Sequence, residues 1–371
     1  MLARELRQRG WNAWAVTLDD PEDIDTAYSH GVDISLHRSN SEYREFTIDR
    51  FLDEVKRKCD ILYFSGVGMM RCSEEQGDLS LLQPRFPREF TDLKNSGVRI
   101  GYSCVGCNDG ISQSEWYEWT GGMCDKCRFQ AEPDICSDTR NLGWGHKLAM
   151  VCDLVATEQN PRLGYLAGET IVSTPFAFCV DEEEWRPGLE IPDEFQITSD
   201  PADVIVLHAV GNFAKRASGT ADPKGTRHVI KTVESLRAEG VPIRLHFVDN
   251  VASGDMKYVQ TQADIVVDQL YFGRYGAMAR ECLMLGKPVV GFLKVNREEE
   301  CDEALACLDE CPIVNASPET LKEVLRDLVT SKDKRIDIGR RSREFAVKWH
   351  SVAAAADRFE GAWRERFGIG G

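Results

Sequence analysis

The sequence predicts an α/β protein of two doubly wound, Rossmann-like domains that face each other across a cleft. Buried-strand patterns alternate with amphipathic helices along the C-terminal half, and less regularly along the N-terminal half. An acidic, proline-containing stretch separates the halves, and 371 residues suffice for two domains of ordinary size. We expect domains over residues 1–181 and 203–345, a linker over 182–202, and helices over 346–371 that pack back on the first domain.

The C-terminal half gives the clearer alternation. Val229, Val233 and Leu236 share one face of a helix that Gly240 ends. The strands expected around it have short apolar runs, which is typical of a parallel sheet covered on both faces. In order, the expected strands are DVIVLHAVG (203–211), PIRLHFVD (242–249), ADIVVDQ (263–269), KPVVGFL (287–293) and PIV (312–314). Further helices are expected after 276, around 304–308 and from Ser317.

The N-terminal half begins with a predicted helix, LARELRQRG (2–10), and a strand, WNAWAVTL (11–18). The further expected strands are CDILYFSGVG (59–68), VRIGYSCVG (98–106) and DLVATEQ (153–159). Two doubly wound domains place the carboxyl ends of their strands at a shared cleft, where ligands of such folds bind.

Composition excludes several classes of partner. The net charge is −16, whereas a nucleic-acid partner requires a surface rich in Lys and Arg. No apolar run approaches the ~20 residues of a membrane span. Thirteen cysteines and an N-terminus without a signal-peptide pattern indicate a reducing, cytoplasmic setting, with cysteines used for packing or metal binding.

Four cysteines have the spacing of a metal site. Cys104, Cys107, Cys124 and Cys127 form C-x2-C-x16-C-x2-C, which predicts a tetrahedral structural zinc site in an insert over about 104–136. Cys136 is a spare that can replace one ligand. Reduced cysteines without metal and an iron–sulfur cluster are the alternatives. An all-sulfur shell leaves no position for a catalytic water.

Three aromatic residues lie between the two cysteine pairs. Trp116, Tyr117 and Trp119 form either a small packed core or an aromatic platform for a ligand. The sequence leaves both interpretations open.

The stretch DQLYFGRYGAMARECLMLGKPVVGF (268–292) combines a glycine turn with a short helix. Met278, Cys282 and Leu285 form its packed face, and Glu281 borders that face. The turn supplies backbone N–H groups at a helix N-terminus, which suit a phosphate. Glu281 is either an ordinary edge carboxylate, solvated or paired with an arginine, or an acceptor for ligand hydroxyl groups.

A second loop, GNFAKRASGTADPKGT (211–226), follows a strand and precedes a helix. Lys215, Arg216 and Lys224 are its basic residues, and Lys224 stands before the helix N-terminus, where a solvated lysine gains nothing from the helix dipole. A bound anion would explain this placement. A flexible surface loop is the alternative, and neither a Walker pattern nor G-x-G-x-x-G is present.

These pieces together resemble the donor domain of family 4-like, retaining glycosyltransferases of the GT-B fold. The resemblance covers about residues 173–292 and includes STPFAFCVDEEEWRP, VLHAVGNFAKR, KGTRHVIKTVESL and the stretch 268–292. It implies that the C-terminal domain binds a nucleotide-diphosphate sugar. The family's basic pair on the diphosphate matches Arg216 and Lys224, with Lys215 as a competitor for Arg216.

The resemblance also assigns the remaining residues of the nucleotide site. It implies that Asn212 joins the site, that the amides of Gly276 and Ala277 contact the phosphates, and that Glu281 holds the ribose hydroxyls. Glu281 matches the second glutamate of the family's Glu-x7-Glu motif. The first glutamate, which contacts the transferred sugar, is replaced by Gly273, and Asp268 is a residue that can compensate.

We therefore expect a metal-independent glycosyltransferase, a hexosyltransferase-like enzyme in which Arg216 and Lys224 meet the charge on the leaving nucleotide. His146 is an acceptor-side candidate at the start of a helix, with a structural role as the alternative. Two other functions stay open: a catalytically degenerate binding or assembly protein, motivated by Gly273, and a sugar-nucleotide epimerase on the same fold. The acceptor is a saccharide, a lipid-linked group, a small molecule or a protein.

Overall fold

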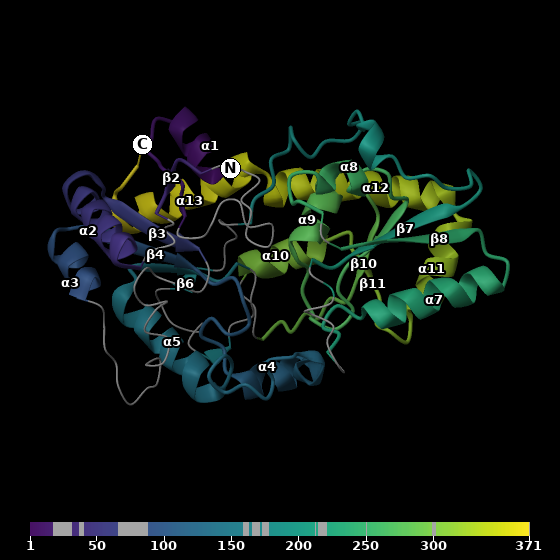
Figure 1. Cartoon of the computed structure of the whole chain (residues 1–371), viewed down its shortest axis with the longest axis horizontal. Coiled ribbons are helices and arrows are strands. Elements are labelled where there is room, and N and C mark those ends of the chain that lie inside the picture. Colours follow the sequence, from purple (N-terminus) through teal and green to yellow (C-terminus); the bar gives the residue numbers. More distant parts are fainter. Residues whose placement is uncertain are drawn as a thin grey trace.

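The computed structural model describes residues 1–17, 32–36, 41–65, 88–158, 163–164, 171–172, 178–211, 213, 221–249, 251–298 and 302–370 (Figure 1). These residues form two main parallel sheets of α/β type, one in each half of the chain, and a separate two-stranded pair. The predicted mixed α/β fold with two Rossmann-like sheets is confirmed. Among the described residues, no helix combines the length and apolarity that a membrane crossing needs.

The C-terminal sheet has the order β11-β10-β9-β7-β8, and all its strand pairs are parallel. Its strands are β7 (Val204–Ala209), β8 (Ile243–Val248), β9 (Ile265–Val267), β10 (Val289–Gly291) and β11 (Val314–Asn315). Its helices are α7 (Thr226–Ala238), α8 (Met256–Gln260), α9 (Ala277–Met284), α10 (Asp302–Glu310) and α11 (Leu321–Thr330). Strand β7 lies between β8 and β9. The strands that follow β7 are therefore added first on one side of it and then on the other, and the switch point falls between β7 and β9. A crevice opens at such a switch point, beyond the carboxyl ends of the strands.

The N-terminal sheet is simpler, with neighbours in sequence order. Its strands are β3 (Ile61–Ser65), β4 (Arg99–Ser103), β5 (Leu154–Ala156) and β6 (Ile171–Val172), while β1 (Val16–Thr17) and β2 (Ile34–Ser35) form a separate pair. Its helices are α1 (Leu2–Gln8), α2 (Ser41–Lys58), α3 (Arg88–Asn95) and α5 (Asp138–Val151). Between β4 and α5 the insert contributes α4 (Gln113–Thr120) and the 3-10 helix η3 (Met123–Lys126). The short 3-10 helix η5 (Asp193–Phe195) lies in the linker.

Two long helices at the C-terminus connect the halves, α12 (Lys332–His350) and α13 (Val352–Phe367). Figure 1 shows them along one side of both sheets, with α4 on the other side. Phe359 and Trp363 of α13 pack edge-on against Tyr63 of β3. Gly101 of β4 permits this contact, because a Cβ atom there would lie 2.3 Å from the Tyr63 ring and 2.8 Å from Trp363.

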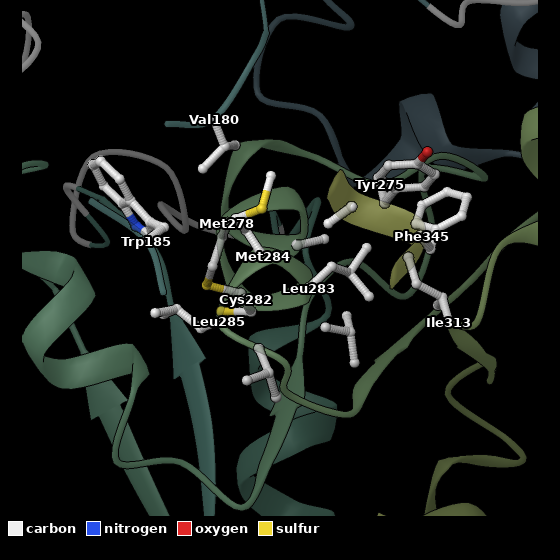
Figure 2. Close-up of a cluster of buried hydrophobic side chains, with 14 of the residues drawn as sticks. Val180, Trp185, Tyr275, Met278, Cys282, Leu283, Met284, Leu285, Ile313 and Phe345 are labelled. Carbon is white, nitrogen blue, oxygen red and sulfur yellow. The ribbon is translucent and has the colours of Figure 1, made fainter. Parts of the chain in front are cut away.

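The chain passes between the halves twice, near Val180 and near Ser351, and these two places lie side by side. Val180 donates its N–H to the His350 carbonyl at 2.8 Å, directly before the Ser351 hydroxyl caps α13. Below this junction, Met278 and Cys282 of α9 and Leu285 at its C-cap are buried, as predicted, in one cluster with Trp185 and Phe345 (Figure 2). Helix α9 is therefore fixed between the sheet and α12.

One predicted boundary is wrong by a turn. The expected helix from Ser317 begins as α11 at Leu321, because Ser317 and Pro318 form a turn in which the Ser317 carbonyl accepts the Thr320 and Leu321 amides.

Candidate functional site

The carboxyl end of β7 carries His208, which is fully buried at the switch point. Its Nδ1 lies 2.8 Å from the Val267 carbonyl oxygen of β9, and its Nε2 lies 2.9 Å from Thr226 Oγ1 of α7. Burial lowers the pKa of His208 to about 4. A neutral ring therefore ties two strands and a helix together, which is a structural role.

Lys224 lies beside this histidine, in the loop that leads into α7. Its Nζ donates to the Ala209 carbonyl at 3.1 Å and to Asp268 Oδ1 at 3.2 Å. Asp268 follows β9 and is 1% exposed, so its carboxylate is buried, whereas the Lys224 side chain keeps partial contact with solvent. The other oxygen of Asp268 accepts the Gly276 amide at 3.0 Å, at the N-terminus of α9. Asp268 therefore joins the predicted basic residue to the predicted phosphate-binding turn.

Glu281 lies one turn into α9 and is half-buried. Its Oε2 accepts a hydrogen bond of 2.6 Å from Nε2 of Gln260 in α8. Desolvation raises the pKa of Glu281 to about 7, although the Gln260 hydrogen bond and the Lys224 charge act in the opposite direction. The partner of Glu281 is thus an amide rather than an arginine, and its carboxylate belongs to the same electrostatic cluster as Lys224 and Asp268.

The structure thus brings four sequence-predicted residues together: Lys224, Gly276, Ala277 and Glu281. Three others, Asn212, Lys215 and Arg216, lie outside the described residues.

A cavity separates the carboxyl edges of the two sheets. One wall, here called the C-terminal wall, comes from the turn after β9 and the first turn of α9; its residues are Gln269, Phe272, Arg274, Tyr275, Gly276, Ala277 and Arg280. The opposite, N-terminal wall consists of Cys104, Val105 and Glu158, with Phe178 at the edge. The helix N-terminus predicted to bind phosphate therefore faces a carboxylate across the cavity.

Sequence reasoning missed Glu158. This residue follows β5 by two positions, is 4% exposed, and has a left-handed backbone with φ 50°. Ser103 at the end of β4 donates its hydroxyl to Glu158 Oε1 at 2.6 Å, and Tyr63 Oη lies 2.8 Å from the same hydroxyl. Non-glycine residues in this backbone region concentrate at functional sites. The available signal was a carboxylate directly after a buried apolar run, DLVATEQ.

The sequence predicts that His146 lies at the start of a helix, and this prediction is wrong. Helix α5 begins at Asp138, because the Ser137 hydroxyl accepts the Arg140 amide at 3.3 Å and caps the helix there. His146 is consequently in the middle of α5 and half-buried. It is not among the described residues that line the cavity.

The predicted set of four cysteines also needs correction. Cys104 continues the β4 ladder through its amide, which donates to the Ala156 carbonyl at 2.8 Å, and its buried thiol is close to Cys152 and Glu158. Cys107, Cys124 and Cys127 instead line a second small cavity together with Cys136. Within the described part of the chain, no three His, Cys, Asp or Glu side chains are already arranged to hold a metal ion.

Gly273 has a physical reason to be glycine. Its φ is 75°, and a Cβ atom there would lie 2.9 Å from the Trp119 ring of α4. The guanidinium of Arg274 lies 4.6 Å above the same ring, and Lys294 Nζ donates to the Trp119 carbonyl. The insert therefore occupies the space that a side chain at 273 would need. Trp116 and Trp119 are buried, as the packed-core interpretation requires, whereas Tyr117 is 40% exposed.

Comparisons with known proteins agree with this architecture. No family model matches the sequence, and no curated protein matches it. Among solved structures, sucrose-phosphate synthase from Thermosynechococcus elongatus is similar with a TM-score of 0.58 and 14% identity, over 99% of this chain and 92% of that one. A glycosyltransferase from Rickettsia africae is similar with a TM-score of 0.50 and 11% identity, over 90% and 85% of the two chains. At these identities the likeness shows the fold: the two-domain GT-B arrangement expected from the sequence.

Proposed function

We propose that this chain is a glycosyltransferase that moves a sugar from a nucleotide-diphosphate sugar to an acceptor, without a catalytic metal ion. One observation carries the proposal. Lys224, Asp268, Gly276 and Glu281 are linked at the switch point of the C-terminal sheet, and Gly276 lines the cavity between the two sheets. This is the position at which doubly wound folds bind nucleotides.

The diphosphate would take the place that Asp268 now fills. Lys224 and the Gly276 amide both bind Asp268 oxygens, so both are already oriented toward negative charge. The free backbone N–H groups at the N-terminus of α9 also form the positive end of the helix dipole. We infer that these groups stabilise the charge that develops on the leaving phosphate, with Arg216, Lys215 and Asn212 as the predicted additions to the site.

The nucleoside would bind next to Glu281. A carboxylate accepts hydrogen bonds from two vicinal hydroxyls, and Gln260 orients one of its oxygens. With a pKa of about 7, Glu281 is partly protonated at neutral pH in the absence of ligand. Ribose hydroxyls bonded to the carboxylate would favour its ionised form, so nucleotide binding should lower this pKa.

The acceptor would enter from the N-terminal wall. There Glu158 presents a carboxylate that Ser103 holds in one orientation. We propose that Glu158 positions the acceptor hydroxyl while the bond from the sugar anomeric carbon to phosphate oxygen breaks. The acceptor oxygen then bonds to that carbon, its proton passes to the departing phosphate, and the configuration is retained. The chemical class of the acceptor stays open, as does the predicted cytoplasmic setting.

A screen of nucleoside diphosphates and their sugars by thermal shift, followed by chromatography of the donor, tests the proposal. We expect at least one nucleotide-diphosphate sugar to raise the melting temperature and to be consumed, by hydrolysis or by transfer to an added saccharide. The absence of both effects for every donor would contradict the proposal.

Gly273 and Trp119 favour a second candidate, a binding protein on a glycosyltransferase fold, because Trp119 fills the space of the missing sugar-contacting glutamate. Nucleotide binding without any transfer or hydrolysis of the donor would support this candidate instead.

A further inference from the structure

The insert brings four thiols to one place. Cys107 precedes α4, Cys124 and Cys127 belong to η3 and its end, and Cys136 lies one residue before the Ser137 cap of α5; all four line one small, largely apolar cavity. Cys107 lies close enough to each of the other three for their charges to interact, and Cys124 likewise to Cys127 and Cys136. The chain therefore folds three separate segments around this point.

Polar side chains surround the sulfur of Cys136. Asn141 Nδ2 lies 3.4 Å and Gln113 Nε2 lies 3.6 Å from Cys136 Sγ, and both amides line the cavity. The buried guanidinium of Arg140 is close enough to interact with Cys136 electrostatically. Asn141 is 1% exposed, and its Oδ1 has no hydrogen-bond partner among the described residues. Amide donors beside a metal-binding sulfur are the outer contacts that orient such a ligand.

The same insert touches the loop of the C-terminal wall that carries Gly273. Trp116 lies 5.0 Å from Phe272 between ring centroids and 5.1 Å from Trp119. The Asp222 amide, at the entrance to α7, donates to the Lys126 carbonyl of η3 at 3.0 Å. Helix α4 and η3 therefore connect the cysteine cavity to the proposed sugar-binding loop.

We propose that Cys107, Cys124, Cys127 and Cys136 bind one Zn²⁺ ion, and that this ion holds Trp119 against Gly273 as the insert's contribution to the sugar side of the cavity. Four thiolates in a closed, apolar surround are the donor set of structural zinc, with each sulfur about 2.3 Å from the ion. The first part of the proposal stands apart from the proposed function, whereas the link to sugar binding rests on it.

Two alanine variants separate this ligand set from the one that the sequence spacing predicts. Zinc is measured in purified wild type, Cys136→Ala and Cys104→Ala. We expect about one zinc per chain in wild type and in Cys104→Ala, and a loss of most zinc, roughly tenfold or more, in Cys136→Ala. Zinc retained by Cys136→Ala but lost by Cys104→Ala would overturn the ligand set.

Wild-type protein alone provides a second readout, in case a variant fails to fold. Titration of its thiols with a mercurial, in the presence of a coloured zinc chelator, should release one zinc ion per chain, and the release should accompany the reaction of four thiols. Protein without zinc, or protein that holds iron and sulfide instead, would overturn the proposal.

Amide hydrogen exchange tests the link to the loop. After zinc removal, residues 269–276 should exchange roughly tenfold faster, because the insert no longer holds them, while β8 should be unchanged. Unchanged exchange at 269–276 would remove the link but leave the metal site. Neither result depends on whether the protein transfers sugar.

Discussion

The two walls of the cavity are built in different ways. In the C-terminal half, the described polar groups of the proposed nucleotide site are bonded to one another or to a neighbouring helix: Lys224 to Asp268, Asp268 to Gly276, and Glu281 to Gln260. On the N-terminal wall, Glu158 accepts the Ser103 hydroxyl, and the two residues stand at or just beyond the ends of neighbouring strands, β5 and β4. The bonds in the C-terminal half therefore tie strand ends to helices, whereas the Ser103–Glu158 bond joins two strand ends of one sheet.

The insert complicates this division. It belongs in sequence to the N-terminal half, yet Trp119 packs on Gly273 of the C-terminal half. One half of the chain thus shapes the loop of the other half in which we propose that the sugar binds.

The largest loss of stability is expected when the ion pair between Lys224 and Asp268 is removed. Lys224→Met leaves Asp268 buried without its cation, which should lower the free energy of unfolding by about 3–5 kcal/mol in urea titrations. Lys231→Met on the exposed face of α7 is the matched control and should change it by less than about 0.5 kcal/mol. Similar effects in both variants would show that the C-terminal wall does not depend on this pair.

A variant on the opposite wall should separate chemistry from nucleotide binding. We expect Glu158→Gln to lower the transfer rate about 100-fold, because a neutral amide oxygen accepts a weaker hydrogen bond from the acceptor hydroxyl than a carboxylate does. The affinity for the nucleoside diphosphate should stay unchanged. Kinetics with saturating donor and calorimetry with the nucleotide measure the two quantities. If the nucleotide affinity falls as much as the transfer rate, Glu158 belongs to the nucleotide site, and the two walls do not have separate roles in nucleotide and acceptor binding.

The sequence predicted the C-terminal wall better than the N-terminal wall, for physical reasons. The packed face of α9 follows from apolar spacing, and the turn before it from glycines, both of which are local signals. Glu158 was missed because β5 is only three residues long and because a positive φ at a glutamate has no signature in the sequence. Cys104 was assigned to the metal set because spacing cannot show that its amide continues the β4 ladder and directs the thiol into the core.

A smaller effect should come from the contact between the halves. Gly273→Ala combines a left-handed backbone with a Cβ atom 2.9 Å from Trp119, so it should lower the free energy of unfolding by about 2 kcal/mol. Gly240→Ala has a similar φ of 83° and nothing within 4 Å of the added atom, so it should cost about 1 kcal/mol. The difference between the variants measures the Trp119 contact. Equal losses of unfolding free energy in the two variants would mean that Trp119 moves aside at no measurable cost.

The smallest effect concerns the pH dependence of stability. Folding raises the pKa of Glu281 from 4.5 to about 7, so its ionised form is disfavoured in the folded state. The wild type should lose stability relative to Glu281→Gln as pH rises from about 4.5 through 7, by about 1 kcal/mol once solvent screening of this half-buried group is allowed for. Urea titrations between about pH 5 and pH 8 measure the difference. Parallel curves for the two proteins would place Glu281 in a more solvated setting.

Calorimetry with nucleoside diphosphates tests the central proposal most directly, because it measures the C-terminal site without an acceptor. A charged hydrogen bond contributes about 1.5–3 kcal/mol, so Glu281→Ala should weaken binding roughly 10- to 150-fold. Glu234→Ala, a change at an exposed position of α7, should leave the affinity unchanged. Equal affinity of the wild type and Glu281→Ala, or no binding of any nucleoside diphosphate by the wild type, would contradict a nucleotide site at this switch point.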